Sequence, residues 1–193
     1  MGADAFADLA ESVGWTEFEL DPDSYDSEDY PARLWDVPDG WVRFVEDTVL
    51  GIKYVDVDAP SRDVDVVKTA FEARDRDELL QLLDLTGAAD DVCRMLRMLA
   101  RAAQATPFDR RIFDAVAVAL DSADEDVQIS ALAVVGRSRW TQFLPHIEGL
   151  TKTSSTRVRA FAANAKVILD TASRMASVAD DQLTSRPEQA KRR

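Results

Sequence analysis

The sequence of 193 residues contains one cysteine and one histidine. An internal disulfide needs two cysteines, and the place of Cys93 in the apolar segment 92–99 predicts a buried, inert thiol. His146 cannot form a metal site by itself, and a Ser-His-Asp triad would depend on it alone. We therefore expect a protein that is not an enzyme and that holds no metal and no cofactor.

Long apolar segments and glycine-rich loops are also missing. No segment approaches the roughly 18 consecutive apolar residues that a membrane-spanning helix needs. Residues 1–20 have neither the basic start nor the apolar centre of a signal peptide. The seven glycines form no phosphate-binding loop. The sequence thus predicts no membrane partner, and the cytoplasm is the simplest location.

Negative charge is in excess, and it is unevenly distributed. The formal net charge is −13. Residues 1–90 contain 24 acidic and 7 basic residues, whereas residues 91–193 contain 12 acidic and 16 basic residues. This balance disfavours general nucleic-acid binding, because phosphate backbones attract Lys and Arg. It favours a basic protein partner, although a solvated acidic surface would also explain it.

Residues 1–62 are predicted to form an acidic N-terminal cap. Residues 1–14 have the spacing of a short amphipathic helix, and 21–31 combine acids with prolines in a loop. Residues 41–46 and 51–57 are rich in β-branched and aromatic side chains, which predicts a β-hairpin. A lone hairpin is marginally stable in water, so it must pack on helices. We expect Trp35, Trp41 and Phe44 to be buried there; these large side chains gain most from burial.

From residue 63 to residue 183 the pattern is helical, and it repeats. Three segments align on one frame, in which Val92, Val127 and Val158 take equivalent positions. Successive valines are 35 and 31 residues apart. Each segment opens a helix that follows a shorter one, and short polar loops make the two helices of a pair antiparallel. We expect all three valines to be buried.

This repeat resembles the HEAT-repeat family of armadillo-type α-solenoids. The residues that carry the resemblance are Leu144, Pro145, Ile147, Leu150, Val158 and Arg159. It covers about residues 75–172, and Cys93 and Gln128 stand where the family often has arginine. The resemblance implies a mainly α fold: a short stack of HEAT-like helical hairpins, with a small acidic N-terminal segment that contains a β-hairpin. An unrelated helical bundle is the alternative. Residues 184–193 are predicted to form a disordered basic tail.

Seven arginines are candidates for partner binding. They are Arg94, Arg97, Arg101, Arg137, Arg139, Arg157 and Arg159. In a solenoid they would line the concave surface as a basic strip. Salt bridges with Asp91, Asp124 and Asp126 are the simpler explanation, and each such exposed pair would contribute little stability.

Four aspartates near the predicted hairpin form a second candidate group. They are Asp56, Asp58, Asp63 and Asp65. Their spacing departs from a calcium-binding loop, because Pro60 occupies a ligand position and the required glycine and final glutamate are missing. We therefore assign them to contacts with a partner.

The sequence as a whole predicts a non-catalytic, protein-binding scaffold, with an immunity or antitoxin-type partner of a basic effector protein as one form. We expect a monomer whose partner is a basic protein, with nucleic acid less favoured. The alternative is a nucleic-acid-binding protein with an Arg-lined concave face, similar to HEAT-like proteins that excise alkylated bases. A HEAT-like enzyme related to bilin lyases is a third hypothesis, supported by the fold alone.

Overall fold

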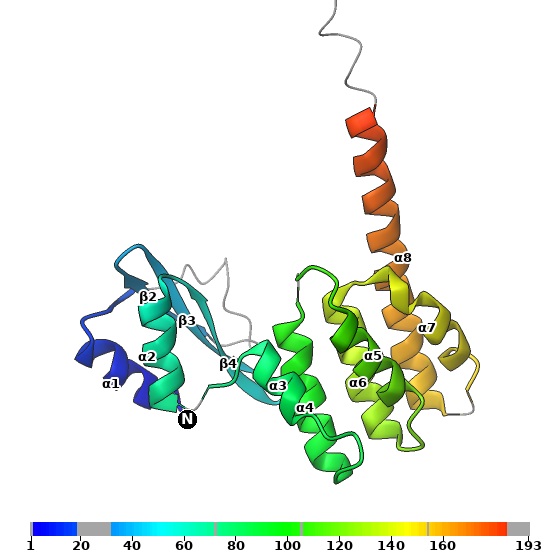
Figure 1. The fold of residues 1–193 in the computed structure, drawn as a ribbon, viewed down its shortest axis with the longest axis horizontal. Helices are drawn as coiled ribbons and strands as arrows, with labels where there is room; N and C mark the ends of the chain where they lie inside the picture. The colour runs from blue at the N-terminus through cyan, green and yellow to red at the C-terminus, as the bar shows by residue number, and fades with distance from the viewer. Residues whose placement is uncertain (1, 19–31, 72, 105, 154, 185–193) are drawn as a thin grey trace, which may run out of the picture. The chain divides into compact units, whose positions relative to one another are not determined.

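The computed structural model describes residues 2–18, 32–71, 73–104, 106–153 and 155–184, with side chains up to residue 175. The chain forms two compact units, Met1–Asp75 and Arg76–Arg193. Unit 1 combines a β-sheet with two helices, and unit 2 is helical (Figure 1). Helix 61–71, which the sequence analysis assigned to the helical region that begins at residue 63, belongs to unit 1.

Unit 1 is built on a four-stranded antiparallel sheet in the order β1-β2-β3-β4. Its elements are α1 (Ala3–Ser12), β1 (Thr16–Phe18), β2 (Ala32–Val37), β3 (Gly40–Asp47), β4 (Ile52–Asp58) and α2 (Ser61–Phe71). Both helices cover one face of the sheet (Figure 1).

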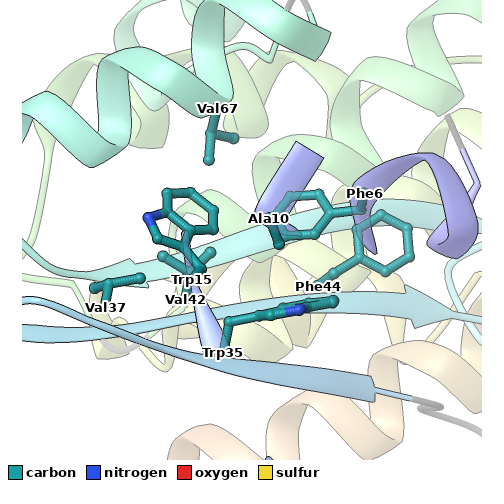
Figure 2. Packing of buried hydrophobic residues seen from close by; sticks show 8 residues of the cluster. All are labelled: Phe6, Ala10, Trp15, Trp35, Val37, Val42, Phe44 and Val67. Carbon is teal, nitrogen blue, oxygen red and sulfur yellow. The ribbon is translucent and has the colours of Figure 1, made fainter. Parts of the chain in front are cut away.

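The core of unit 1 lies between this sheet face and the helices. Alternate residues of β2, β3 and β4 point into it, because successive side chains of a strand face opposite sides. Trp35 from β2 and Phe44 from β3 meet Phe6 from α1, and Val67 from α2 closes the cluster (Figure 2). The ring centroid of Phe6 lies 4.8 Å from that of Trp35 and 5.3 Å from that of Phe44.

Close backbone packing fixes the turn between β2 and β3. Asp39 in this turn has a φ of 70°. A Cβ atom on Gly40 would lie 1.8 Å from the carbonyl oxygen of Asp58, at the end of β4. Only glycine therefore allows β3 to begin so close to the backbone of β4.

Unit 2 consists of helices that pack in pairs. Its elements are α3 (Arg76–Leu82), α4 (Ala89–Ala102), α5 (Arg110–Leu120), α6 (Glu125–Ser138), the 3-10 turn η1 (Thr141–Phe143), α7 (Leu144–Leu150) and α8 (Thr156–Thr184). Helices α3, α5 and α7 pack on α4, α6 and α8 respectively, and α6 contacts both α4 and α8. Val92, Val127 and Val158, in the first turns of α4, α6 and α8, are 3%, 6% and 0% exposed, as the repeat frame predicts.

The sequence-based fold class, a mainly α stack of helical hairpins with an attached β-hairpin, is wrong. The chain has a mixed α/β fold, because the sheet has four strands and its own helical cover. β1 was missed because its three residues are all exposed and show no alternation. β2 was missed because Arg33 and Asp36 interrupt its apolar pattern.

The side chain of Trp41 also departs from its prediction. Trp35 and Phe44 are buried in the core, but Trp41 is on the opposite sheet face and 36% exposed. Trp41 pairs with Asp58 of β4. It is adjacent in the chain to Val42, whose side chain faces the core, so the side chain of Trp41 faces the other side of the sheet. The predicted loop 21–31 and all but the first residue of the predicted tail 184–193 lie outside the described residues.

Candidate functional site

The seven candidate arginines fall into groups at opposite ends of the helices. At the N-terminal ends, Arg94 pairs with Asp91 of its own helix at 3.2 Å, and Arg157 of α8 pairs with Asp126 of α6 at 2.9 Å. Arg159 donates to the carbonyl oxygen of Thr153. The simpler explanation expected salt bridges between repeats, and of these contacts the pair of Arg157 with Asp126 is of that kind, whereas the pair of Arg94 with Asp91 lies within one helix.

At the C-terminal ends of α4 and α6, two arginines converge on one amide. Arg101 and Arg137 both donate to Oε1 of Gln104, the latter at 3.0 Å. Arg139 ends α6 with a φ of 58°. In the described part of the chain, the side chains of Arg97 and Arg139 take part in no hydrogen bond or ion pair.

The four candidate aspartates lie in different environments. Asp56 pairs across the sheet with Arg43, and Asp58 lies exposed on the same face. Asp63 is 6% exposed at the start of α2, whereas Asp65 is exposed. Among the residues that the structure describes, no three His, Cys, Asp or Glu side chains are placed to hold a metal ion.

A groove in unit 2 is the better-formed candidate site. It has a volume of about 460 Å³, within the usual range for ligand pockets. It lies where the N-terminal ends of α4 and α6 meet the C-terminal end of α5. Its lining consists of Leu85, Gly87, Ala89, Val92, Val118, Ala119, Asp121, Ser122, Asp124 and Val127.

Hydrogen bonds hold the first wall of the groove, the turn between α3 and α4. The amide and the hydroxyl of Thr86 both donate to Oδ1 of Asp84, at 2.9 and 2.7 Å. These bonds stabilise the carboxylate and lower the pKa of Asp84. The amide of Gly87 donates to the carbonyl oxygen of Asp84 at 3.1 Å and closes the turn.

The second wall, the loop between α5 and α6, is held in the same way. Oδ1 of Asp124 accepts the amides of Asp126 and Val127, which caps α6. The amide of Asp124 donates to Oγ of Ser122. Nε2 of Gln128 donates to the carbonyl oxygen of Leu120 at 3.1 Å, which ties the end of α5 to α6. Both walls are therefore preorganised.

The groove combines an apolar floor with an acidic rim. Its apolar lining includes Val92, Val118 and Val127, of which Val118 is the most exposed. The segments 84–92 and 118–127 that form it contain seven acidic residues and no basic residue. These are Asp84, Asp90, Asp91, Asp121, Asp124, Glu125 and Asp126. Arg94 and Arg157 neutralise two of them.

Folding stability does not explain Asp121. Acids in the first turns of α4 and α6 stabilise those helices through the helix dipole, but Asp121 ends α5, where the dipole disfavours a negative charge. Within the described ranges, its carboxylate has no ion pair or hydrogen bond.

Sequence reasoning did not identify this groove. It considered the loop 121–126 only as a source of helix caps, and it did not compare this loop with residues 84–91. The available signal was that both connections are acidic without a single base, and that both precede equivalent repeat segments.

Comparisons with known proteins yield no match to a family model, a curated protein or a solved structure. The resemblance to HEAT repeats therefore rests on the sequence pattern alone. None of the helices in the described part of the chain has the length and apolarity that crossing a membrane requires.

Proposed function

We propose that the chain is a non-catalytic binding protein whose groove in unit 2 holds a segment of a basic protein partner. The segment would place one large apolar side chain in the groove, with Arg or Lys residues on either side. The observation that carries the proposal is an apolar floor enclosed by connections with seven acids and no base.

The floor supports an apolar anchor. Val118 is 61% exposed although it borders the groove, so a bound side chain would remove it from water. Full burial of a leucine-sized side chain contributes about 1.5–3 kcal/mol. Preorganised walls lower the entropy cost of binding, because neither loop must be ordered on contact.

The rim supports a basic partner. Asp121 and Asp124 line the groove, and the segments 84–92 and 118–127 that form it contain five further acids. Such a field attracts cationic segments, accelerates their association and repels acidic ones. An immunity or antitoxin-type protein that binds a basic effector is one role of this kind. The cytoplasm, where thiols stay reduced, suits a chain with a single buried cysteine.

Binding of designed peptides to the full chain tests the proposal. The probes are short capped peptides with a central leucine, phenylalanine or tryptophan flanked by arginines. Matched peptides carry glutamates in place of the arginines. Fluorescence anisotropy should show binding of the arginine series that weakens with salt, and no binding of the glutamate series. Equal binding of both series would remove the electrostatic part of the proposal, and binding of neither would reject it.

Two variants with matched controls locate the binding site. Val118→Lys places a cation at the groove, and we expect at least a tenfold loss of affinity, about 1.4 kcal/mol. Val167→Lys changes an equally exposed valine of α8, at 62%, and should bind as the wild type does. Asp121→Asn should weaken binding several-fold, whereas Glu148→Gln, on the exposed surface of α7, should not. Loss of binding in the control variants would place the site elsewhere.

A further inference from the structure

The two ends of helices α4 and α6 carry opposite charge. Their N-terminal ends border the acidic groove. Their C-terminal ends lie in the segments 95–108 and 129–147, which contain four arginines and no acidic residue. These are Arg97, Arg101, Arg137 and Arg139. In a chain with a net charge of −13, this end of unit 2 is a surface with a chemistry of its own.

Hydrogen bonds fix the C-terminal ends of α4 and α6 against each other. The indole Nε1 of Trp140 donates to the carbonyl oxygen of Thr106 at 3.0 Å. Trp140 is only 6% exposed, so little water competes for this bond. Oγ1 of Thr106 donates to the carbonyl oxygen of Ala103, also at 3.0 Å, and so holds the turn after α4. Side chains from the two ends therefore have a fixed spacing.

Two guanidinium groups meet at one point of this surface. Nη1 of Arg101 and Nη1 of Arg137 both donate to Oε1 of Gln104. The two arginines are half-buried, and Gln104 is exposed. The acceptor that they share is thus a neutral amide oxygen within reach of solvent. Two positive charges held beside one acceptor repel each other, and an anionic oxygen would offset that repulsion better than a neutral one.

The helix dipole explains only part of this arrangement. Arg101 and Arg137 lie in the last turns of α4 and α6, where the dipole favours a positive charge. The dipole acts on each arginine separately. It does not require the two side chains to converge on a single atom.

Other arginines that connect neighbouring helices of unit 2 donate to a carboxylate. Arg111 of α5 pairs with Asp77 of α3, and Arg157 of α8 pairs with Asp126 of α6, both at 2.9 Å. The bond from Arg137 of α6 to the end of α4 goes to an amide instead. A neutral acceptor at this one position leaves room for an anion from outside.

The charge and the number of donors fit a phosphomonoester. At neutral pH this group carries nearly two negative charges and presents three acceptor oxygens, so it can accept from both guanidinium groups and match their charge. A carboxylate has one charge and two oxygens. Arginine forms paired N–H bonds to phosphate. A nucleic-acid strand fits less well, because each phosphodiester has one charge and the acidic chain repels a polyanion.

We propose that Arg101 and Arg137 form a binding site for a phosphomonoester, whose oxygens take the place of the amide oxygen of Gln104. Arg97 and Arg139 raise the positive potential at the same end of unit 2. None of these residues lines the acidic groove, so the site stands independently of the proposed function.

Chemical-shift titration of the full chain in phosphate-free buffer tests the ligand class. The probes are phosphoserine with both ends blocked, aspartate blocked in the same way, and a dinucleoside monophosphate. Phosphoserine should give saturable shifts at the ends of α4 and α6, and the other two probes should bind at least tenfold more weakly. Equal binding of aspartate would reject the requirement for a dianion. Tighter binding of the dinucleotide would assign the site to nucleic acid, and the absence of phosphoserine binding would reject the proposal.

Arginine substitutions test the location of the site. Arg101→Gln and Arg137→Gln should each weaken phosphoserine binding by at least tenfold. Arg94→Gln is the matched control, because Arg94 belongs to the same helix as Arg101 but lies at its other end. Circular dichroism checks that all three variants remain folded. An equal loss in Arg94→Gln would overturn the proposed location.

Gln104→Glu gives the sharpest test, since it supplies an internal anion to both arginines. We expect a higher unfolding temperature and loss of phosphoserine binding, because the new carboxylate occupies the position of the phosphate. Gln104→Ala removes the competing amide and should retain binding. Binding of arginine-flanked peptides to the groove should be unchanged in both variants, so the two proposals fail separately. Wild-type affinity for phosphoserine in Gln104→Glu would contradict the proposed site.

Discussion

The two units bury their apolar side chains in different ways. Unit 1 concentrates burial in a few aromatic rings from distant segments, and the ring of Phe6 lies within 6.3 Å of those of Trp15, Trp35, Phe44 and Phe71. Unit 2 distributes most of it over aliphatic side chains of α4, α5, α6 and α8, and adds one aromatic cluster around Phe143 and Trp140. A unit of the first kind depends on single residues, and a unit of the second kind tolerates their loss better.

Removal of one ring should break unit 1 most severely. Phe6 is fully buried, so Phe6→Ala should destabilise the fold by about 3–5 kcal/mol. Ala131→Gly in α6 removes a buried methyl group from unit 2 and should cost about 1 kcal/mol, mainly through lower helix propensity. Urea unfolding followed by circular dichroism measures both. Equal losses would contradict the comparison.

A pair of glycine substitutions should have opposite signs in the two units. Gly40→Ala forces a Cβ atom against the backbone of Asp58, and we expect a loss of about 3 kcal/mol, at the upper end for overpacking. Gly136→Ala meets only an ordinary contact with Ile168 and lies inside α6, so it should stabilise the protein by up to about 1 kcal/mol. Thermal unfolding of both variants gives the signs directly. Destabilisation by Gly136→Ala would show that α6 and α8 are more tightly packed than their contact indicates.

Within unit 2, the helices α4 and α6 differ in their N-terminal caps, and substitutions at these caps should change the stability of the protein. Asp124 caps α6, whereas Ala88 precedes α4 without a side-chain cap. Asp124→Ala should therefore cost about 1 kcal/mol, and Ala88→Ser should add about 0.5–1 kcal/mol. Asp121→Asn should also stabilise slightly, because it removes a charge from the C-terminal end of α5. Greater stability with weaker peptide binding in this one variant would mark Asp121 as a binding residue.

The pH dependence of stability should show the smallest effect, and it should be shared by both units. A side-chain hydrogen bond from Arg33 lowers the pKa of Glu17 in unit 1, and one from Arg111 lowers the pKa of Asp109 in unit 2. A lowered pKa stabilises the fold above the ordinary carboxyl pKa of about 4, and this contribution is lost as the pH falls through the lowered value. The urea concentration at the unfolding midpoint should therefore decrease as the pH is lowered below about 4. Glu17→Gln and Asp109→Asn should each reduce the dependence of the urea midpoint on pH in this range. An unchanged dependence would refute the lowered pKa values of Glu17 and Asp109.

The difference between the units also explains what could be predicted. Strands 41–46 and 51–57 appear as β3 and β4, and the frame of Val92, Val127 and Val158 places three buried valines correctly. Periodicity reveals such elements because each buries one continuous side. β1 and β2 escaped detection because the residues of β1 are all exposed, and Arg33 and Asp36 interrupt the apolar alternation of β2.

The candidate site was less predictable than the fold. The groove depends on how the connection after α3 meets the connection after α5, and those connections are more than thirty residues apart. Individual arginines and aspartates were visible in the sequence. Their partners, such as Gln104 between Arg101 and Arg137, follow only from the packing of α4 on α6.

Amide chemical-shift mapping of the full chain with an arginine-flanked leucine peptide tests the groove most directly. The account predicts saturable shifts concentrated in residues 85–92 and 118–127, and their loss in Val118→Lys. Shifts centred on the sheet of unit 1 or on α8, or no shifts at all, would contradict it.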